Sequence, residues 1–200
     1  VTSPPDGYTL LMGTTVLSIN THLMPKLDYD AAKDLVPIIN VGESSGAIVA
    51  VPASSPVKTL AELVALEKTK PGQLSFATAG AGSIGHIAGE QFNQLAGTKF
   101  VHVAYRGSSQ SLTDVLRGEV AFAIDTAVAV LPFTQNGTLR ALAVTGTDRL
   151  KTLPDIKTFG EQGMTGLEIY AWWAVLAPAS TPADVVKKLG DEIEKAVAAE

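Results

Sequence analysis

The stretch Thr78-Ala79-Gly80-Ala81-Gly82-Ser83-Ile84-Gly85-His86 decides how the centre of this chain folds and where it can bind. It follows a short apolar run, Leu74 to Ala77, and opens a helical pattern that continues to Leu95. A strand that turns through glycines into a helix leaves unpaired backbone N–H groups at the helix start. Those donors and the positive end of the helix dipole favour an anion. The sequence therefore predicts a strand–turn–helix unit that can hold a carboxylate or a phosphate.

This turn differs from the common nucleotide-binding loops. No Lys-Ser or Lys-Thr pair follows the glycines, as a P-loop requires, and the dinucleotide-binding fingerprint is not complete. A nucleotide is therefore the weaker ligand. Gly80, Gly82 and Ser83 favour close approach of the backbone to a small anion, although a tight turn capped by Ser83 without any ligand remains an alternative.

Composition excludes several classes of protein. The 200 residues suffice for one or two domains, 46% of them are hydrophobic, and the formal net charge is −5. Scattered Lys and Arg in an acidic chain argue against a nucleic-acid surface. The absence of cysteine excludes disulfides, thiolate metal sites and a cysteine nucleophile. No cluster of His, Asp or Glu has metal-ligand spacing, so we expect no metal and no cofactor. No apolar run approaches the ~20 residues that cross a bilayer.

Strand and helix patterns alternate along the chain. We expect apolar strands at 8–13, 74–77, 100–103, 120–124 and 139–144, and a loop at 25–34. Helices are expected after a capping box at 59–62, after Ser83, after Ser108 or Ser109, after Asp125-Thr126, and after Pro182, with Val186, Leu189, Ile193 and Val197 of the last one buried. This alternation predicts an α/β fold with a parallel sheet covered on both faces.

Two long extended segments, 38–51 and 167–178, bracket one complete αβ block. This layout predicts two lobes that the chain crosses twice. Residues 43–166 would form lobe 2, and residues 1–42 and 167–200 would form part of lobe 1. The chain starts directly before a strand and stops within a helical pattern without a leader sequence, so we expect it to be a piece of a longer protein whose first lobe is incomplete.

Small polar residues follow four of the expected strands. In an open parallel sheet, ligands lie beyond the carboxyl ends of the strands. The expected ligand-binding residues are Thr14, Thr15, Thr78, Gly80, Gly82, Ser83, Tyr105, Arg106, Gly107, Ser108 and Asp125.

These side chains have alternative roles. Arg106 could pair with a carboxylate through two N–H groups, or it could be a solvated surface residue. Tyr105 could line the site and donate its hydroxyl, or it could pack in the core. Asp125 could accept a hydrogen bond from a ligand amine or a water, or it could cap the following helix. A structural role is the preferred interpretation of His86.

No arrangement of residues points to catalysis. Ser83, His86 and Asp125 superficially form a triad, but Ser83 and His86 lie on one helical turn and no nucleophile elbow is present. We therefore expect no enzyme activity. Of Trp172 and Trp173, we expect one in the core and the other facing the cleft between the lobes, with both packed as the alternative.

Several motifs occur together in a fixed order. They are Pro5-Asp6-Gly7-Tyr8-Thr9-Leu10-Leu11, Asp28-Tyr29-Asp30, Pro37-Ile38, Ala79-Gly80-Ala81-Gly82-Ser83, His86-Ile87-Ala88-Gly89-Glu90, Val103-Ala104-Tyr105-Arg106-Gly107, Arg140-Ala141-Leu142-Ala143-Val144-Thr145 and Ala177-Pro178-Ala179-Ser180-Thr181-Pro182. In this combination the chain resembles the Bug-type receptors, the periplasmic solute-binding proteins of tripartite tricarboxylate transporters, over essentially its whole length.

The resemblance implies a two-lobed Venus-flytrap fold with two crossings between the lobes. It implies a periplasmic, monomeric receptor that captures a small organic acid, such as a dicarboxylate, a tricarboxylate, an amino acid or an aromatic carboxylate, and passes it to a membrane permease. By motif position, the loops that hold the ligand are 78–83, 105–108, Asp125 and Thr14-Thr15. The chain departs from the family pattern at both ends, where family members carry further residues.

Two other classes share parts of this pattern. An effector-binding domain of a transcription regulator has the same two-lobed layout, but it would need a helix-turn-helix region, of which the sequence shows no sign. An enzyme that acts on small acids is the third class.

Overall fold

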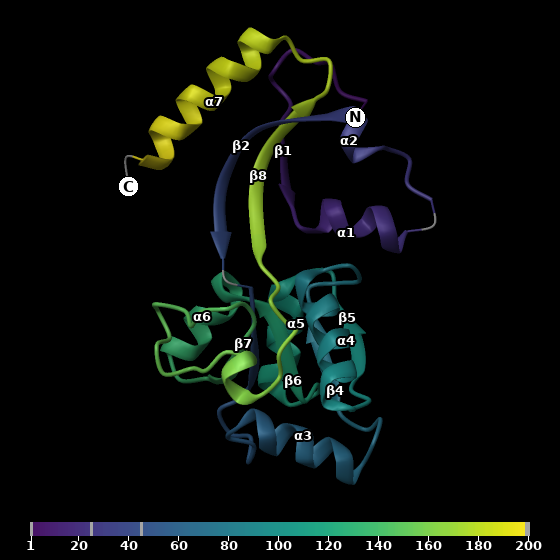
Figure 1. Cartoon of the computed structure of the whole chain (residues 1–200), viewed down its shortest axis with the longest axis vertical. Coiled ribbons are helices and arrows are strands. Elements are labelled where there is room, and N and C mark those ends of the chain that lie inside the picture. Colours follow the sequence, from purple (N-terminus) through teal and green to yellow (C-terminus); the bar gives the residue numbers. More distant parts are fainter. Residues whose placement is uncertain (1, 25, 45, 199–200) are drawn as a thin grey trace. The chain divides into compact units, whose positions relative to one another are not determined.

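In the computed structural model, residues 2–24, 26–44 and 46–198 are described, and they divide into two compact units (Figure 1). Unit 1 combines the described residues up to Glu43 with those from Trp172 onward, and unit 2 is the continuous segment 44–171. The sequence predicts lobe boundaries at 42/43 and 166/167. Pro25 in the expected loop and Ser45 in the first expected extended segment lie outside the described residues.

Unit 2 is built on a five-stranded sheet in the order β5–β4–β6–β3–β7. Its strands are β3 (Ala47–Pro52), β4 (Ser75–Thr78), β5 (Val101–Ala104), β6 (Phe122–Thr126) and β7 (Leu139–Val144). Strand β4 is parallel to β5 and β6, whereas β3 is antiparallel to both β6 and β7. The prediction of a parallel sheet is therefore wrong for β3. Its continuous apolar run is typical of any strand buried on both faces and does not encode direction.

Helices cover both faces of this sheet, as predicted (Figure 1). The helices of unit 2 are α3 (Leu60–Thr69), α4 (Ile84–Ala96), α5 (Ser108–Arg117) and α6 (Ala127–Gln135), with a short 3₁₀ helix η1 at Gly160–Gln162. Helix α4 lies on the face of Phe76, whose ring occupies the space beside Gly89. Leu112 of α5 and Val130 of α6 share the opposite core with Ala77, because successive residues of a strand point to opposite faces.

Local signals in the sequence correctly place the start of α3 and the end of α4. The Thr59 hydroxyl accepts a hydrogen bond from the Glu62 N–H at 3.1 Å and so begins α3. The Glu62 carboxylate bonds the N–H of Lys58 at 2.6 Å rather than that of Thr59, so the capping box is only half formed. Gly97 ends α4 with a φ of +62°, the left-handed conformation that glycine adopts without steric cost.

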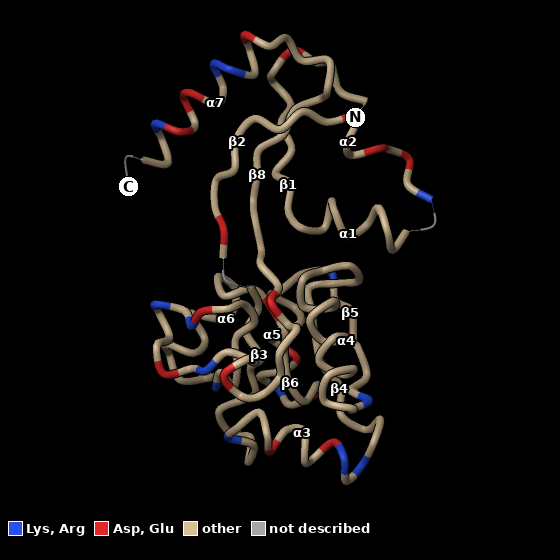
Figure 2. Tube along the Cα trace, in the orientation of Figure 1, with Lys and Arg blue, Asp and Glu red and all other residues tan. Residues whose placement is uncertain are grey.

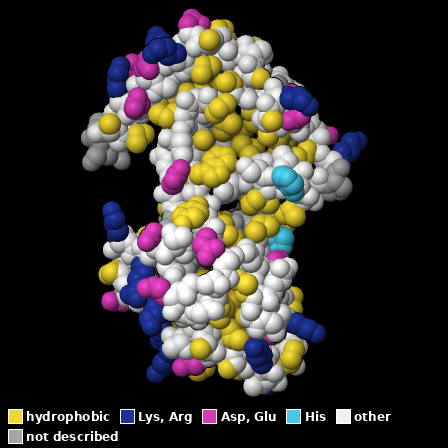
Figure 3. Space-filling view, in the orientation of Figure 1, with side chains coloured by type: hydrophobic (Ala, Val, Ile, Leu, Met, Phe, Trp, Pro, Cys, Tyr) yellow, Lys and Arg dark blue, Asp and Glu magenta, His cyan; other side chains and the backbone are white. Residues whose placement is uncertain are grey.

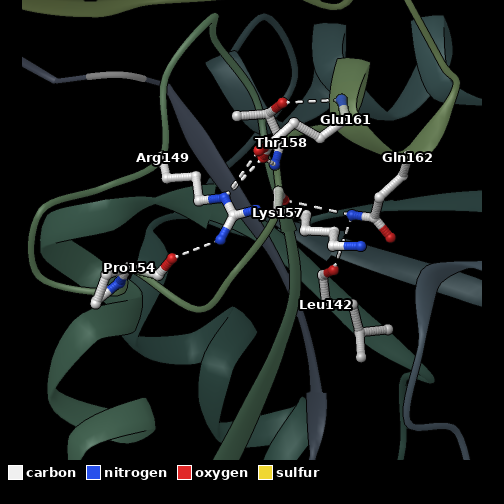
Figure 4. Close-up of polar contacts among 7 residues, drawn as sticks. All are labelled: Leu142, Arg149, Pro154, Lys157, Thr158, Glu161 and Gln162. Atoms are coloured by element: carbon white, nitrogen blue, oxygen red, sulfur yellow. Dashed lines mark hydrogen bonds and ion pairs between the residues drawn. The ribbon is translucent and has the colours of Figure 1, made fainter.

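The outer edge of β7 is covered by the segment that follows it (Figure 4). The Arg149 Nε lies 3.0 and 2.8 Å from the two oxygens of Glu161, and an Arg149 Nη1–H donates to Pro154 O at 2.8 Å. Glu161 also accepts from the Thr158 N–H at 2.8 Å, while Gln162 donates to Leu142 O at 3.2 Å. These bonds hold a strap, residues 149–162, over a strand edge that would otherwise be open to another chain.

Unit 1 contains a three-stranded sheet in the order β1–β8–β2. Its elements are β1 (Leu11–Thr14), α1 (Val16–Leu23), α2 (Ala31–Asp34), β2 (Leu35–Ser44), β8 (Ala171–Pro178) and α7 (Ala183–Ala198), of which Ser44 and Ala171 already belong to unit 2. Strand β1 is antiparallel to β8, with Leu11 opposite Leu176. Trp172 and Trp173 are both half-buried.

The prediction of a buried strand from Tyr8 is wrong. The strand begins at Leu11, and Tyr8 and Met12 expose 94% and 58% of their surface. Figure 3 shows hydrophobic side chains gathered on the surface of unit 1 over β1 and β8. Hydrophobicity shows that a strand can be buried, but burial requires a covering layer, and β1 is an edge strand of its sheet.

Two further predictions for unit 1 fail. The expected loop contains α2, which Asp30 caps by accepting a hydrogen bond from the Ala32 N–H at 3.1 Å. Helix α7 begins after Pro182 as predicted, but its apolar face is not buried, and Val197 is 52% exposed. Acidic and basic residues follow one another along α7 (Figure 2). An amphipathic pattern shows which face can pack, and not that a neighbour is present.

Among the described residues, no helix combines the length and the hydrophobicity that crossing a membrane requires.

Candidate functional site

Polar groups gather at one edge of the five-stranded sheet, which we call the polar edge. Strands β4, β5, β6 and β7 all end at this edge and β3 begins there, as their parallel and antiparallel pairing requires. The polar edge consists of residues 78–83, 105–108, 125–126 and 145–147. It contains every predicted ligand residue of unit 2. Thr14 and Thr15 belong to unit 1, where Thr14 ends β1 and its hydroxyl accepts from the Val16 N–H at 3.4 Å.

The glycine turn, residues 79–83, is held partly by its own N–H groups. The Gly80 N–H donates to the Thr78 hydroxyl at 3.2 Å, and the Gly82 N–H donates to Nδ1 of His86 at 3.1 Å. Ser83 caps α4, as predicted, by accepting from the His86 N–H at 3.3 Å. Four other N–H groups have no acceptor among the described residues, namely those of Ala79, Ala81, Ile84 and Gly85. These four remain able to bind an anion.

The turn after β5 contains one predicted ligand side chain that is bonded within the chain and one that is exposed. The Tyr105 hydroxyl donates to Asp114 of α5 at 2.9 Å and borders a surface hollow of about 490 Å³, so it is already engaged. Burial and the Asp114 carboxylate raise the pKa of this hydroxyl. Arg106 is exposed and forms no ion pair within the described residues. Gly107 is the N-cap of α5, so the prediction that Ser108 or Ser109 caps this helix is wrong.

Asp125 is the least satisfied polar side chain of the polar edge. The residue is 3% exposed, and Oδ1 accepts from the N–H of Thr126 at 2.7 Å. Oδ2 has no hydrogen-bond partner among the described residues. Burial raises the pKa of Asp125, and the hydroxyls of Ser108 and Thr126 oppose that shift only in part. Asp125 ends β6 and Thr126 is the N-cap of α6, so the alternative role of Asp125 as a helix cap is wrong.

The end of β7 belongs to the polar edge, and its polar residues were not predicted to contribute. The buried Thr145 hydroxyl accepts from the Ala47 N–H at 2.8 Å and donates to Ile169 O at 3.1 Å. The Thr147 hydroxyl lies 2.8 Å from that of Tyr170. Polar residues directly after an apolar strand were the signal used at the other strand ends, and the same signal identifies Thr145 to Thr147.

The polar edge lacks the arrangement that a hydrolytic triad requires. The Ser83 hydroxyl bonds the backbone of His86, while the His86 ring bonds the backbone of Gly82. Asp125 lies opposite Ile48 in the sheet and points to the same face as Ala123, two residues before it, which is the face away from α4. Within the described residues no three His, Asp or Glu side chains could hold a metal ion.

Helices α4, α5 and α6 all begin at the polar edge. Each helix start carries a partial positive charge and unpaired N–H donors. The buried Asp125 carboxyl lies near the starts of α5 and α6 with one oxygen unsatisfied, and such a group requires a donor from water or from a ligand. The arrangement can therefore hold an anion that also carries an O–H or N–H group.

Comparison with known proteins gives one family for the whole chain. The sequence model described as "Tripartite tricarboxylate transporter family receptor" matches residues 1–200. A protein from the tcbD–tcbE intergenic region of Pseudomonas sp. strain P51 is 35% identical over 98% of this chain, and BugT of Bordetella pertussis is 34% identical over 98%. The chain spans 59% and 60% of the length of these two relatives.

Solved structures agree with this match. The R. palustris protein Rpa4515, whose structure contains adipate, is 33% identical and superimposes with a TM-score of 0.90 over 94% of this chain and 63% of its own. MatC of Rhodopseudomonas palustris, with bound malate, is 28% identical with a TM-score of 0.90 over 97% of this chain and 66% of its own. The fold of this chain is therefore the α/β fold of periplasmic binding proteins.

Proposed function

Because this chain belongs to the tripartite tricarboxylate transporter family of receptors, we propose that it is a solute-binding receptor that captures a small organic acid. The observation that carries the proposal is the orphaned Oδ2 of the buried Asp125, at the edge of the sheet where α4, α5 and α6 begin. The helix starts attract the carboxylate of a ligand, and Asp125 accepts a hydrogen bond from a neighbouring group of the same ligand.

The proposed ligand class follows from these two requirements. Adipate and malate, which two relatives hold in their structures, are small dicarboxylates. An ionised Asp125 would repel a ligand that offers carboxylate oxygens alone, because two buried like charges are costly. A hydroxyl or amino group beside the carboxylate removes this repulsion by donating to Oδ2. We therefore favour hydroxy- and amino-dicarboxylates over plain dicarboxylates.

In this proposal, units 1 and 2 are the two lobes of a Venus-flytrap receptor. Arg106 of unit 2 pairs with a ligand carboxylate, and the roles of Thr14 and Thr15 of unit 1 as ligand residues stay a prediction. Delivery of the ligand to a membrane permease and a periplasmic location complete the proposal, as expected for the family. The segment 44–171 would be one lobe, and the rest of the chain would contribute to the other.

Isothermal titration of the protein against succinate, adipate, malate, aspartate and citrate tests the proposal. We expect saturable binding of at least one acid, with malate or aspartate tighter than succinate. Mass spectrometry of the recovered ligand should show it unchanged, since a receptor performs no chemistry. Failure of every acid in the panel to bind would overturn the assignment, and turnover of a bound acid would favour an enzyme instead.

The Asp125→Asn variant tests the part of the proposal that concerns specificity. Asn keeps an oxygen that can bond the Thr126 N–H, but it removes the charge. We expect the preference for malate over succinate to fall, because the amide no longer attracts the ligand hydroxyl as strongly. An unchanged preference would remove Asp125 from the ligand contacts while leaving the receptor assignment intact.

A further inference from the structure

We propose that His86 and His102 form an uncharged bracket beneath the glycine turn, and that protonation of His86 opens the turn and weakens ligand binding. The bracket consists of these two rings and the Thr78 hydroxyl. The effect on ligand binding rests on the proposed function. The conformation of the turn is a property of the chain itself and can be measured without any ligand.

The bracket ties the two glycines of the turn to the sheet. The rings of His86 and His102 stack with their centroids 4.1 Å apart and their planes 17° apart. Nε2 of His102 lies 2.7 Å from the Thr78 hydroxyl, which also accepts from the Gly80 N–H at 3.2 Å. At the other end of the bracket, Nδ1 of His86 lies 3.1 Å from the Gly82 nitrogen. A path of direct contacts therefore runs from Gly80 to Gly82 through both rings.

The contact with Gly82 determines the tautomer of His86. A backbone N–H can only donate, so Nδ1 of His86 has to accept and the ring proton has to be on Nε2. Protonation of the ring adds a hydrogen at Nδ1, which then faces the hydrogen of Gly82. Two donors cannot bond, and the contact is lost. A formed turn and a neutral His86 are therefore linked.

His102 supports this arrangement as a neutral ring. It stacks on Phe76, with centroids 5.0 Å apart, at the end of an aromatic cluster beneath α4. Burial and the neighbouring His86 lower the pKa of His102 to about 4. His102 therefore stays uncharged through the mildly acidic range, and a charge on His86 would make a second one on His102 still less favourable.

Among the described residues, no carboxylate forms an ion pair with either ring of the bracket. Helix α4 carries Glu90, and Lys99 and Arg106 lie just before and just after β5. Glu168 belongs to the segment that contacts α4 through the bond from Gln91 to Gly166 O. These four charged side chains are exposed, and none pairs with either ring within the described residues. Strand β4 carries no charged residue.

Opening of the turn changes what the polar edge offers to an anion. The N–H groups of Ala79 and Ala81 alternate with those of Gly80 and Gly82, which point to the bracket. When the bond to His86 is lost, the backbone at Gly82 is no longer held in place. The N–H groups of Ala79 and Ala81 then lose their fixed orientation toward an anion. Because the turn that binds the ligand excludes a proton from Nδ1 of His86, protonation of that ring should lower ligand affinity, by at most about tenfold for each pH unit.

Two-bond ¹H–¹⁵N spectra of the histidine rings test the bracket without a ligand. We expect His86 to show the Nε2–H tautomer at pH 8, and the amide signal of Gly82 to shift along the titration curve of the His86 ring. His22→Asn, the same change in α1, is the control and should leave the Gly82 shift unaltered. A His86 ring protonated at Nδ1 in its neutral form, or a Gly82 signal independent of that titration, would overturn the proposal.

Two variants of His86 separate the proton effect from simple loss of structure. Asn can place an amide oxygen near the position of Nδ1 and cannot be protonated, so His86→Asn should keep the turn and abolish the pH dependence of the Gly82 signal. Phe keeps a ring for the stack but offers no acceptor, so His86→Phe should leave the Gly82 amide exchanging rapidly at every pH. Equal behaviour of both variants would contradict the assigned role of Nδ1.

Ligand titration from pH 8 to pH 5 then tests the link to function. The wild-type affinity should fall in acid, and that of His86→Asn should not fall with it. An affinity that rises in acid would contradict the proposal, because it would mean that a cationic His86 attracts the ligand instead of opening the turn. Absence of binding at every pH would overturn the proposed function. The ring and amide spectra would still show whether the bracket forms.

Discussion

At the scale of single residues, the polar edge separates side chains that are already satisfied from those that require a partner. The hydroxyls of Tyr105 and Thr145 are engaged within the chain, at 2.9 Å to Asp114 and 3.1 Å to Ile169 O. Asp125 retains an unpaired oxygen. Residue type identified all of these positions except Thr145 as candidate ligand residues, but only their partners show which of them remain available to a ligand.

Arg106→Ala should weaken ligand binding by about 1.5–3 kcal/mol, the usual range for a hydrogen bond to a charged group. The physical reason is the loss of a direct contact to a carboxylate. Arg117→Ala is the matched control, since it removes the same charge from an exposed position in unit 2 and should leave affinity unchanged. Isothermal titration measures both. An unaltered affinity in Arg106→Ala would place Arg106 outside the site.

Asp125→Asn should stabilise the protein while it impairs binding. Burial raises the pKa of Asp125, so the folded state holds its proton at a higher pH than the unfolded state does. The wild type therefore loses stability as the pH rises through this range, and the uncharged variant does not. We expect a gain on the order of 1 kcal/mol at pH 7. Urea unfolding at pH 7 and at pH 4 measures it, and a gain that is no smaller at pH 4 would contradict the argument.

At the scale of elements, α4 depends on a glycine that allows close contact with the sheet. A Cβ at Gly89 would occupy the position of the Phe76 ring. Gly89→Ala should therefore destabilise unit 2 by about 1–3 kcal/mol, the usual cost of overpacking. In α7, a Cβ at Gly190 would meet Ile38 O at an ordinary 3.6 Å, so Gly190→Ala should be neutral or slightly stabilising. Thermal unfolding compares the two, and equal melting temperatures would contradict the packing argument.

The strap over β7 should make stability sensitive to acid. The Arg149 guanidinium and the Thr158 N–H lower the pKa of Glu161 to about 2 from its ordinary 4.5. A carboxyl with a depressed pKa stabilises the fold above its unfolded value and loses this contribution as the pH falls. The melting temperature of the wild type should therefore fall more between pH 5 and pH 2 than that of Glu161→Gln. Glu192→Gln, in an exposed pair of α7, is the control.

The positions of most helices and strands could be predicted from the sequence. The burial of these elements could not. The ends of α3 and α4 follow from Thr59, Ser83 and Gly97, because capping involves residues only a few positions apart. The burial predicted for the first strand and for α7 fails, because burial depends on which other segments pack against an element.

At the scale of the whole molecule, the division into two units has a direct consequence. Unit 2 is a continuous segment with its own sheet and with helices on both faces of that sheet. Residues 44–171 produced alone should therefore fold cooperatively and keep the bond between Gly82 and His86. Circular dichroism and the Gly82 amide signal measure this. A non-cooperative transition, or the loss of that signal, would show that unit 2 needs the rest of the chain.

The sequence by itself determined the strand–turn–helix unit at 78–86, the alternation of strands and helices, and the family. These depend on residues close together in the chain and on motifs in a fixed order. Only the tertiary structure decided the direction of β3, the burial of Asp125 and the stack of His86 on His102. The physical reason is that each of these is a relation between segments distant in sequence, and no local pattern of hydrophobicity or polarity specifies which segments meet.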